Sequence, residues 1–220
     1  MLHKTRGVVL KYFKYRDTSI IAKIYTEEFG LQSYIVNGVR SARAKGKIAL
    51  FQPLTLLNMV VYKKASSGIQ RISELNCSTP LNSMPYNVVK SSIGVFISEV
   101  LYKCIKEDEP DNSLFNFIHN TILTLDHQKE INLNFHLIFL IQLSHYLGIG
   151  ITSTNQFMHI NNSDKLEKLK ELSKSDYNSK HAITNSLRRA ILNDLLQFYK
   201  THIDIAGEFK SIEILRAVLK

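Results

Sequence analysis

The apolar residues follow one period in the first third of the chain and another in the rest, and the change falls at Pro80 and Pro85. Before these prolines, runs rich in β-branched and aromatic residues are separated by turn residues, which is typical of β-strands. After them, apolar residues recur at the three- and four-residue spacing of amphipathic helices. This change predicts an α+β chain, with strands first and helices afterwards.

Five strands are predicted before Pro80. Gly30 is expected to supply a positive φ in a tight hairpin turn, and residues 37–48 predict a loop. Five short strands, several of them curled and aromatic, suit a small closed barrel, and an OB-fold and an SH3-like barrel are the leading candidates. The strands are expected at residues 5–15, 19–26, 31–36, 54–63 and 69–77.

The rest of the chain predicts helices. Residues 132–147 are apolar almost all round, so this segment is expected to be the buried central helix. Asp111 is a suitable N-cap for the helix that follows it. The other helices are expected at 88–105, 113–125, 165–172, 184–199 and 212–219. We therefore expect a five-stranded barrel, an OB-fold or an SH3-like barrel, at residues 1–80 and an all-helical domain at residues 81–220.

Composition excludes several classes of protein. The hydrophobic share of 45% and the charged share of 21% are ordinary for a folded globular chain and exclude disordered and collagen-like proteins. The longest apolar stretch, 133–147, contains His136 and Gln142 and is too short and too polar to span a bilayer, which needs ~20 apolar residues. The N-terminus carries no secretory signal, so we expect a cytoplasmic protein with no membrane partner.

Catalytic and metal-binding motifs are not recognisable in the sequence. It has no phosphate-cradling glycine loop, no GxSxG elbow and no HExxH, and its eight histidines are scattered. Two cysteines cannot make a disulfide framework or a four-cysteine zinc site. We therefore expect no catalytic residue, no metal and no cofactor. A nuclease is the enzymatic alternative, and the lack of clustered acids for a metal argues against it.

Positive charge is concentrated in the expected barrel. Residues 1–80 hold 13 of the 28 lysines and arginines but only 4 of the 19 acids, so they carry the whole net charge of +9. Such asymmetry indicates a segment that binds a polyanion, joined to a neutral remainder. The alternative is a basic domain whose charge serves only solubility.

Two stretches of the basic segment predict contacts with nucleic acid. In strand 11–16 basic residues alternate with aromatic residues, so an aromatic ring that stacks on a nucleobase can lie beside a side chain that contacts a phosphate. Phe13 is nevertheless expected in the core. Loop 40–47 has small residues between its bases and no apolar anchor, so we expect it to be mobile and to bind phosphates, unless it is merely a solvated loop. The predicted DNA-binding residues are Arg6, Lys11, Lys14, Arg16, Arg40, Arg43, Lys45 and Lys47.

Short motifs along most of the chain follow the order and spacing of a known family. They lie at residues 5–10, 17–19, 24–26, 29–30, 37–41, 52–54, 187–189, 199, 202–203 and 210–215. On these motifs the chain resembles the bacterial RecO family of DNA repair and recombination mediators.

The resemblance implies an N-terminal OB-fold, a helical C-terminal domain and a non-enzymatic role. Family members bind single- and double-stranded DNA, anneal complementary strands and help RecA to load onto DNA coated with single-strand-binding protein (SSB). The implied partners are RecR and the C-terminal tail of SSB. Many members carry a four-cysteine zinc site in the region corresponding to 149–179, where this chain has no cysteine. An RNA-binding OB-fold protein of RNA metabolism is the alternative.

Arg188 and Arg189 are the predicted partner-binding residues. They begin a helix whose apolar face is expected to carry Leu187, Ile191, Leu195 and Phe198. Basic residues beside an apolar groove suit a peptide that ends in a carboxylate and an aromatic residue, as the SSB tail does in relatives of this family. The alternative is that both arginines make ordinary surface ion pairs.

Overall fold

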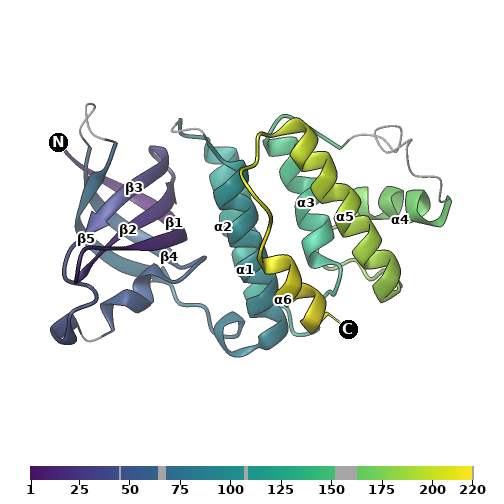
Figure 1. The fold of residues 1–220 in the computed structure, drawn as a ribbon, viewed down its shortest axis with the longest axis horizontal. Coiled ribbons are helices and arrows are strands. Elements are labelled where there is room, and N and C mark those ends of the chain that lie inside the picture. The colour runs from purple at the N-terminus through teal and green to yellow at the C-terminus, as the bar shows by residue number, and fades with distance from the viewer. Residues whose placement is uncertain (45, 64–67, 107–108, 152–162, 220) are drawn as a thin grey trace. The chain divides into compact units, whose positions relative to one another are not determined.

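Five strands form a closed barrel at the N-terminal end of the chain (Figure 1). The structure is a computed structural model that describes residues 1–44, 46–63, 68–106, 109–151 and 163–219. The strands are β1 (Leu2–Tyr15), β2 (Ser19–Thr26), β3 (Gly30–Val36), β4 (Leu56–Tyr62) and β5 (Gln70–Thr79). Each of the five predicted strands is present, and their ends differ from the predicted ends by at most a few residues.

The barrel has the strand order β1-β2-β3-β5-β4 and closes where β4 pairs with β1. All neighbouring strands are antiparallel except β3 and β5, which pair in parallel through Tyr34 and Gln70. β1 is long enough to pair with β4 along its first half and with β2 along its second half. This five-stranded arrangement confirms the predicted OB-fold.

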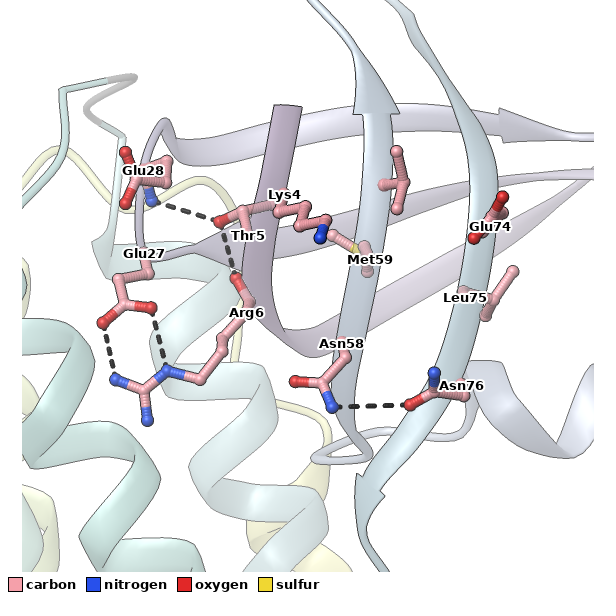
Figure 2. Close-up of a pocket in the computed structure, with 11 residues that line it drawn as sticks. Lys4, Thr5, Arg6, Glu27, Glu28, Asn58, Met59, Glu74, Leu75 and Asn76 are labelled. Atoms are coloured by element: carbon pink, nitrogen blue, oxygen red, sulfur yellow. Dashed lines mark hydrogen bonds and ion pairs between the residues drawn. The ribbon is translucent and has the colours of Figure 1, made fainter. Parts of the chain in front are cut away.

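The hairpin between β2 and β3 is held against β1. Gly30 adopts the expected positive φ, 60°. The backbone N–H of Glu27 donates to the Arg6 carbonyl at 3.1 Å. The backbone N–H of Glu28 donates to the Thr5 hydroxyl at 3.2 Å (Figure 2). The hairpin is therefore fixed to the first strand by its backbone as well as by the barrel core.

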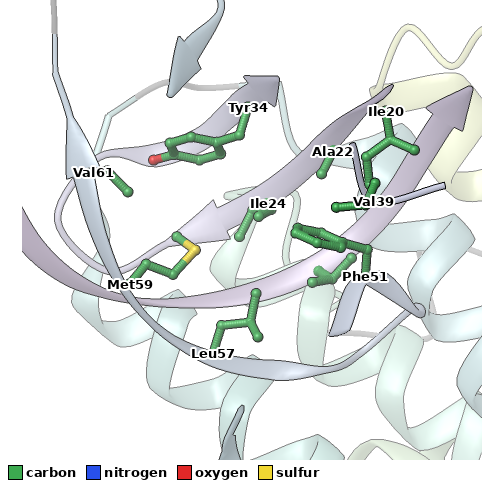
Figure 3. Close-up of a cluster of buried hydrophobic side chains, with 10 residues drawn as sticks. Ile20, Ala22, Ile24, Tyr34, Val39, Phe51, Leu57, Met59 and Val61 are labelled. Carbon is green, nitrogen blue, oxygen red and sulfur yellow. The ribbon is translucent and has the colours of Figure 1, made fainter. Parts of the chain in front are cut away.

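The barrel interior is filled by side chains from the inward faces of the strands (Figure 3). Gly7 lies at a closely packed point of this interior, because a Cβ atom there would come within 2.8 Å of Ile24 and 3.0 Å of Met59. The cluster consists of Val9, Ile20, Ala22, Ile24, Tyr34, Val39, Phe51, Leu57, Met59 and Val61.

Six α-helices follow the barrel in the described part of the chain. α3 is the buried helix that its apolar sequence predicts, and the Asp111 carboxylate caps α2 by accepting from the N–H groups of Ser113 and Leu114. The barrel and the following helices confirm the α+β class. The helices are α1 (Val88–Cys104), α2 (Asn112–His127), α3 (Phe135–Tyr146), α4 (Ser163–Ser173), α5 (Asn185–His202) and α6 (Ser211–Val218).

The chain divides into two compact units. The barrel unit contains residues 1–82 and 98–123, and the helical unit contains residues 83–97 and 124–220. The predicted boundary near residue 80 describes the order of strands and helices, whereas the barrel unit also includes part of α1 and part of α2. In the described ranges, no helix combines the length and apolar character needed to cross a membrane.

Candidate nucleic-acid interface

A β-bulge at Leu10 decides which side chains of β1 lie outside the barrel. The pairing of β1 with β2 is regular up to Val9 and shifts before Lys11. Val9 belongs to the barrel core, and in a regular strand Lys11 and Phe13 would also point inward. Because the bulge adds one residue, Tyr12 packs against the core instead, and Lys11 and Phe13 are exposed on the outer face.

Two lysines lie opposite each other on this outer face. Lys11 of β1 pairs in register with Lys23 of β2, and Phe13 pairs with Ile21. Like charges directly opposite each other destabilise a sheet. Within the described residues, no ion pair joins either lysine to an acid. A bound anion would remove the repulsion, so this arrangement favours a polyanionic ligand.

Phe13 lies beside Tyr102 of α1, and both belong to the barrel unit. The ring centroids are 6.1 Å apart and the ring planes are inclined by 59°. The Lys11 ammonium lies 5.1 Å from the Phe13 centroid and 4.8 Å from the Tyr102 centroid. Phe13 is 39% exposed, so the prediction that it belongs to the core is wrong; the bulge at Leu10 is the reason.

We call Lys11, Phe13, Lys23 and Tyr102 the outer-face cluster. The sequence prediction missed Lys23 and Tyr102. Alternation in β2 could have identified Lys23, because Ile20, Ala22 and Ile24 all enter the core and residue 23 must point the other way. Tyr102 has no comparable local signal, since its position depends on how α1 packs on β1.

Arg16 and Arg40 meet at the turn between β1 and β2. Nη1 of Arg40 donates to the Arg16 carbonyl at 3.1 Å, and the backbone N–H of Arg40 donates to the Thr18 carbonyl at 2.9 Å. The Arg16 guanidinium lies 5.2 Å from the ring centroid of Tyr15. Both arginines are exposed. The fold therefore places two predicted DNA-binding residues, 24 positions apart in sequence, side by side.

The basic loop has an apolar anchor. It contains two short 3₁₀ helices, η1 (Ala42–Ala44) and η2 (Lys47–Phe51). Val39 and Ala44 are buried, and Ile48 packs against the barrel core, so the expectation of a loop without an apolar anchor is wrong. Arg43 and Lys47 are exposed on this support, and Lys45 lies outside the described residues. The barrel core thus holds in place a surface that carries basic side chains.

Arg6 is paired with an acid inside the barrel unit (Figure 2). Its Nε and Nη2 atoms donate to the two carboxylate oxygens of Glu27 at 2.8 and 2.5 Å, and its guanidinium lies 5.0 Å from the Phe115 centroid. The hydrogen-bonded Arg6 lowers the pKa of Glu27. Among the predicted DNA-binding residues that the structure describes, Arg6 is the one that forms an ion pair with an acid. Lys14, another member of the predicted set, is exposed.

Arg188 and Arg189 point in different directions. Arg188 is buried and donates to Asn134 Oδ1 at 3.0 Å, Asn185 Oδ1 at 2.5 Å and the Ile183 carbonyl at 3.0 Å. Arg189 is exposed and donates to the Arg216 carbonyl at 3.0 Å. The two arginines therefore do not share one site.

The apolar face of α5 is part of the core. Ile191, Leu195 and Phe198 are buried, so the expectation that they line an open peptide groove is wrong. Their burial follows from packing of this amphipathic face inside the helical unit. A separate groove of about 1120 Å³ lies between the end of α2, the start of α3 and residues 177–183, and Arg188 contributes to its wall.

The described ranges offer few side chains for metal binding or for thiol chemistry. No group of three His, Cys, Asp or Glu side chains is placed there to hold a metal ion. Cys104 is buried, and this burial raises the pKa of its thiol to about 12. The thiol is therefore protonated at neutral pH. The prediction of no catalytic residue stays a prediction.

Comparison with known proteins identifies the family. The N-terminal family model of Recombination protein O matches residues 1–81, and its C-terminal model matches residues 85–165. DNA repair protein RecO of Bacteroides fragilis is 32% identical over 238 aligned positions, and that of Flavobacterium psychrophilum is 33% identical over 235, with 98% of each chain covered. DNA repair protein RecO of Phocaeicola vulgatus is 31% identical over 240 positions, also with 98% of each chain covered. The chain therefore belongs to the RecO family of DNA repair proteins.

Proposed function

We propose that this protein is a non-enzymatic, cytoplasmic mediator of recombinational repair. It binds single- and double-stranded DNA, anneals complementary strands and assists the loading of RecA onto SSB-coated DNA. RecR is its proposed partner in this reaction. Membership of the RecO family supports the repair role, and the surface of the barrel supports the contact with DNA.

The observation that carries the proposal is the pair of facing lysines on the outer face of the OB barrel. Lys11 and Lys23 repel each other in the free protein, and an exposed aromatic ring lies next to them. A phosphate backbone offers the counter-charge, and unpaired bases offer faces to stack. The exposed Arg16, Arg40, Arg43 and Lys47 extend the positive surface along the β1–β2 turn and the basic loop.

The SSB tail is the proposed ligand of the helical unit. Arg188 donates only to uncharged oxygens in its described hydrogen bonds, and burial lowers its pKa, yet an arginine stays protonated in proteins. A peptide carboxylate in the groove beside Arg188 would supply a counter-charge. This proposal moves the tail site away from the α5 apolar face and keeps Arg188 in it.

Annealing of complementary DNA strands, with and without SSB, tests the function. The wild-type protein is expected to accelerate annealing in both conditions. Lys11→Gln together with Lys23→Gln should slow annealing. Lys170→Gln together with Lys174→Gln removes the same charge from exposed positions in α4 and directly after it, and should not slow annealing. No acceleration by the wild-type protein would contradict the proposal.

Two further arms separate the alternative functions. Equal-length RNA and DNA strands distinguish a DNA mediator from an RNA-binding OB-fold protein, and tighter binding to RNA would favour the latter. Incubation of labelled DNA with magnesium or manganese should leave the strands intact. Strand cleavage would instead identify a nuclease.

A further inference from the structure

We propose that Phe13 and Tyr102 form a stacking site for an unpaired nucleobase, and that Lys11 moves from their ring faces to a phosphate when single-stranded DNA binds. This inference rests on the proposed function and deepens it. It assigns a strand-selective role to two aromatic residues and a moving contact to one lysine.

The rings are available because of where they lie. Phe13 is 39% exposed and Tyr102 is half-buried, although aromatic side chains of this size normally contribute to a core. Their planes are inclined by 59°, so they do not cover each other as parallel stacked rings would. A planar base can therefore lie against one ring while its edge approaches the other.

The Lys11 ammonium occupies the ring faces in the free protein. It is 5.1 Å from one centroid and 4.8 Å from the other, and no described ion pair holds it. A cation–π contact at an exposed site is weak, whereas an ammonium–phosphate hydrogen bond is charge-assisted. A strand that brings a base and its phosphate together gives Lys11 a stronger partner and frees the rings.

Lys23 adds the second reason for the exchange. It lies directly opposite Lys11 on the neighbouring strand, and adjacent strands are ~4.8 Å apart. The repulsion between the two ammonium groups is relieved when both contact the same phosphate backbone. The site selects single strands because the faces of bases in a duplex are already covered by their neighbours.

Fluorescence anisotropy with an oligo(dT) strand and with a duplex of equal length tests the site. Phe13→Leu and Tyr102→Leu are each expected to weaken oligo(dT) binding about tenfold, since stacking is worth that much per base, and to change duplex binding less than twofold. Tyr102→Phe retains a ring and should bind oligo(dT) as the wild type does. Tyr86→Leu, at an aromatic residue that is 86% exposed in the other unit, is the matched control and should change neither affinity.

A fluorescence measurement and a salt titration distinguish base stacking from a purely structural role of the rings. A 2-aminopurine base in the oligonucleotide should be quenched by the wild-type protein and by Lys11→Met, but less by Phe13→Leu. Lys11→Met should also reduce the salt slope of single-strand binding by about 0.7, because one phosphate is no longer neutralised. An unchanged slope would overturn the exchange of Lys11.

The failures of the two proposals look different. If the wild-type protein bound neither oligo(dT) nor duplex, the proposed function itself would fail. If the wild-type protein bound both while Phe13→Leu and Tyr102→Leu kept full affinity for oligo(dT), only the stacking site would be overturned. An equal loss of affinity for duplex and single strand would likewise overturn its strand selectivity.

Discussion

Arg40 donates a hydrogen bond from its side chain to the backbone carbonyl of Arg16, a residue whose φ is 49°. This bond joins the basic loop to the β1–β2 turn. The positive φ is a left-handed conformation that costs a non-glycine residue about 1–2 kcal/mol. Arg16 therefore occupies a position that glycine would fill with less strain, which indicates that its side chain serves a purpose other than stability.

Replacing Arg16 separates its charge from its backbone. Arg16→Gly should raise the free energy of unfolding by up to about 1 kcal/mol relative to Arg16→Ala, because only glycine relaxes the left-handed turn. Both variants should reduce the salt slope of DNA binding by about 0.7–0.9. Urea unfolding and salt titrations measure the two effects. A glycine variant less stable than the alanine variant would contradict the strain argument.

The basic loop is expected to bind phosphates. Alanine at Arg40, Arg43, Lys45 and Lys47 should weaken binding to all DNA sequences and flatten its salt dependence by about 0.7–0.9 for each phosphate that is no longer neutralised. The control variant removes four lysines from the other unit, Lys168, Lys170, Lys174 and Lys200. The control should retain the wild-type slope, and an unchanged slope in the loop variant would identify the loop as a solvated surface.

Gly7 should not tolerate a side chain. A Cβ atom at this position would approach Ile24 to 2.8 Å, and the branched Ile24 side chain cannot retreat within the barrel core. Gly7→Ala is therefore expected to lower the free energy of unfolding by about 1–3 kcal/mol, the usual effect of overpacking. Chemical denaturation measures it, and Gly68→Ala, where a Cβ atom meets nothing within 4 Å, is the control.

His136 makes the stability of the chain sensitive to mild acid. Burial, and then the charge of Arg188, lower the pKa of His136 to about 3. Between its unfolded pKa near 6.5 and this value, the unfolded chain binds a proton that the folded chain does not, so stability falls as pH falls. The loss is about 1.4 kcal/mol per pH unit.

His136→Phe removes this titration and keeps the edge-on contact with Phe96. The difference in unfolding free energy between wild type and variant should shift in favour of the variant as the pH is lowered from 6.5 to 4. His145→Gln, at an exposed position of the same helix, should keep the pH dependence of the wild type. Parallel pH profiles for wild type and His136→Phe would contradict the prediction.

Metal removal should leave folding unaffected. A structural zinc needs about four Cys or His ligands, and residues 149–179 offer only His159. His181, just beyond, already bonds the Ser175 hydroxyl through Nε2 at 2.5 Å. Chelator treatment should therefore leave the thermal unfolding midpoint unchanged. A clear drop in the midpoint, or stoichiometric zinc by elemental analysis, would contradict this expectation.

The architecture was predictable because its signals are local. Alternation predicted the strands, an apolar stretch predicted the buried α3, and Gly30 predicted its own turn. Each of these features depends on residues within one element. Local patterns therefore suffice for the order of elements and for the class of fold.

The candidate site was less predictable because it depends on contacts between distant residues. Arg188 has the sequence context of a surface helix, yet it is buried against Asn134, 54 positions away. The sequence of loop 40–47 looks purely polar and basic. The loop is nevertheless anchored, because Val39 before it belongs to the barrel core and Ile48 after it packs against that core. Tyr102 reaches the outer face only through the packing of α1 on β1.

The bulge at Leu10 makes the outer surface of the barrel depend on how β1 pairs with β2 as well as on the residues that β1 contains. If Leu10 took a regular place in the pairing, Lys11 and Phe13 would turn toward the interior and Tyr12 would turn out, whereas deleting Leu10 would remove the bulge and leave Lys11 and Phe13 outside and Tyr12 inside. A scan of point substitutions keeps a residue at position 10 and therefore does not separate these two cases. Deletion of Leu10 is therefore expected to keep Lys11 and Phe13 on the surface, whereas a pairing of β1 with β2 without the bulge would exchange the lining and the surface along the rest of the strand.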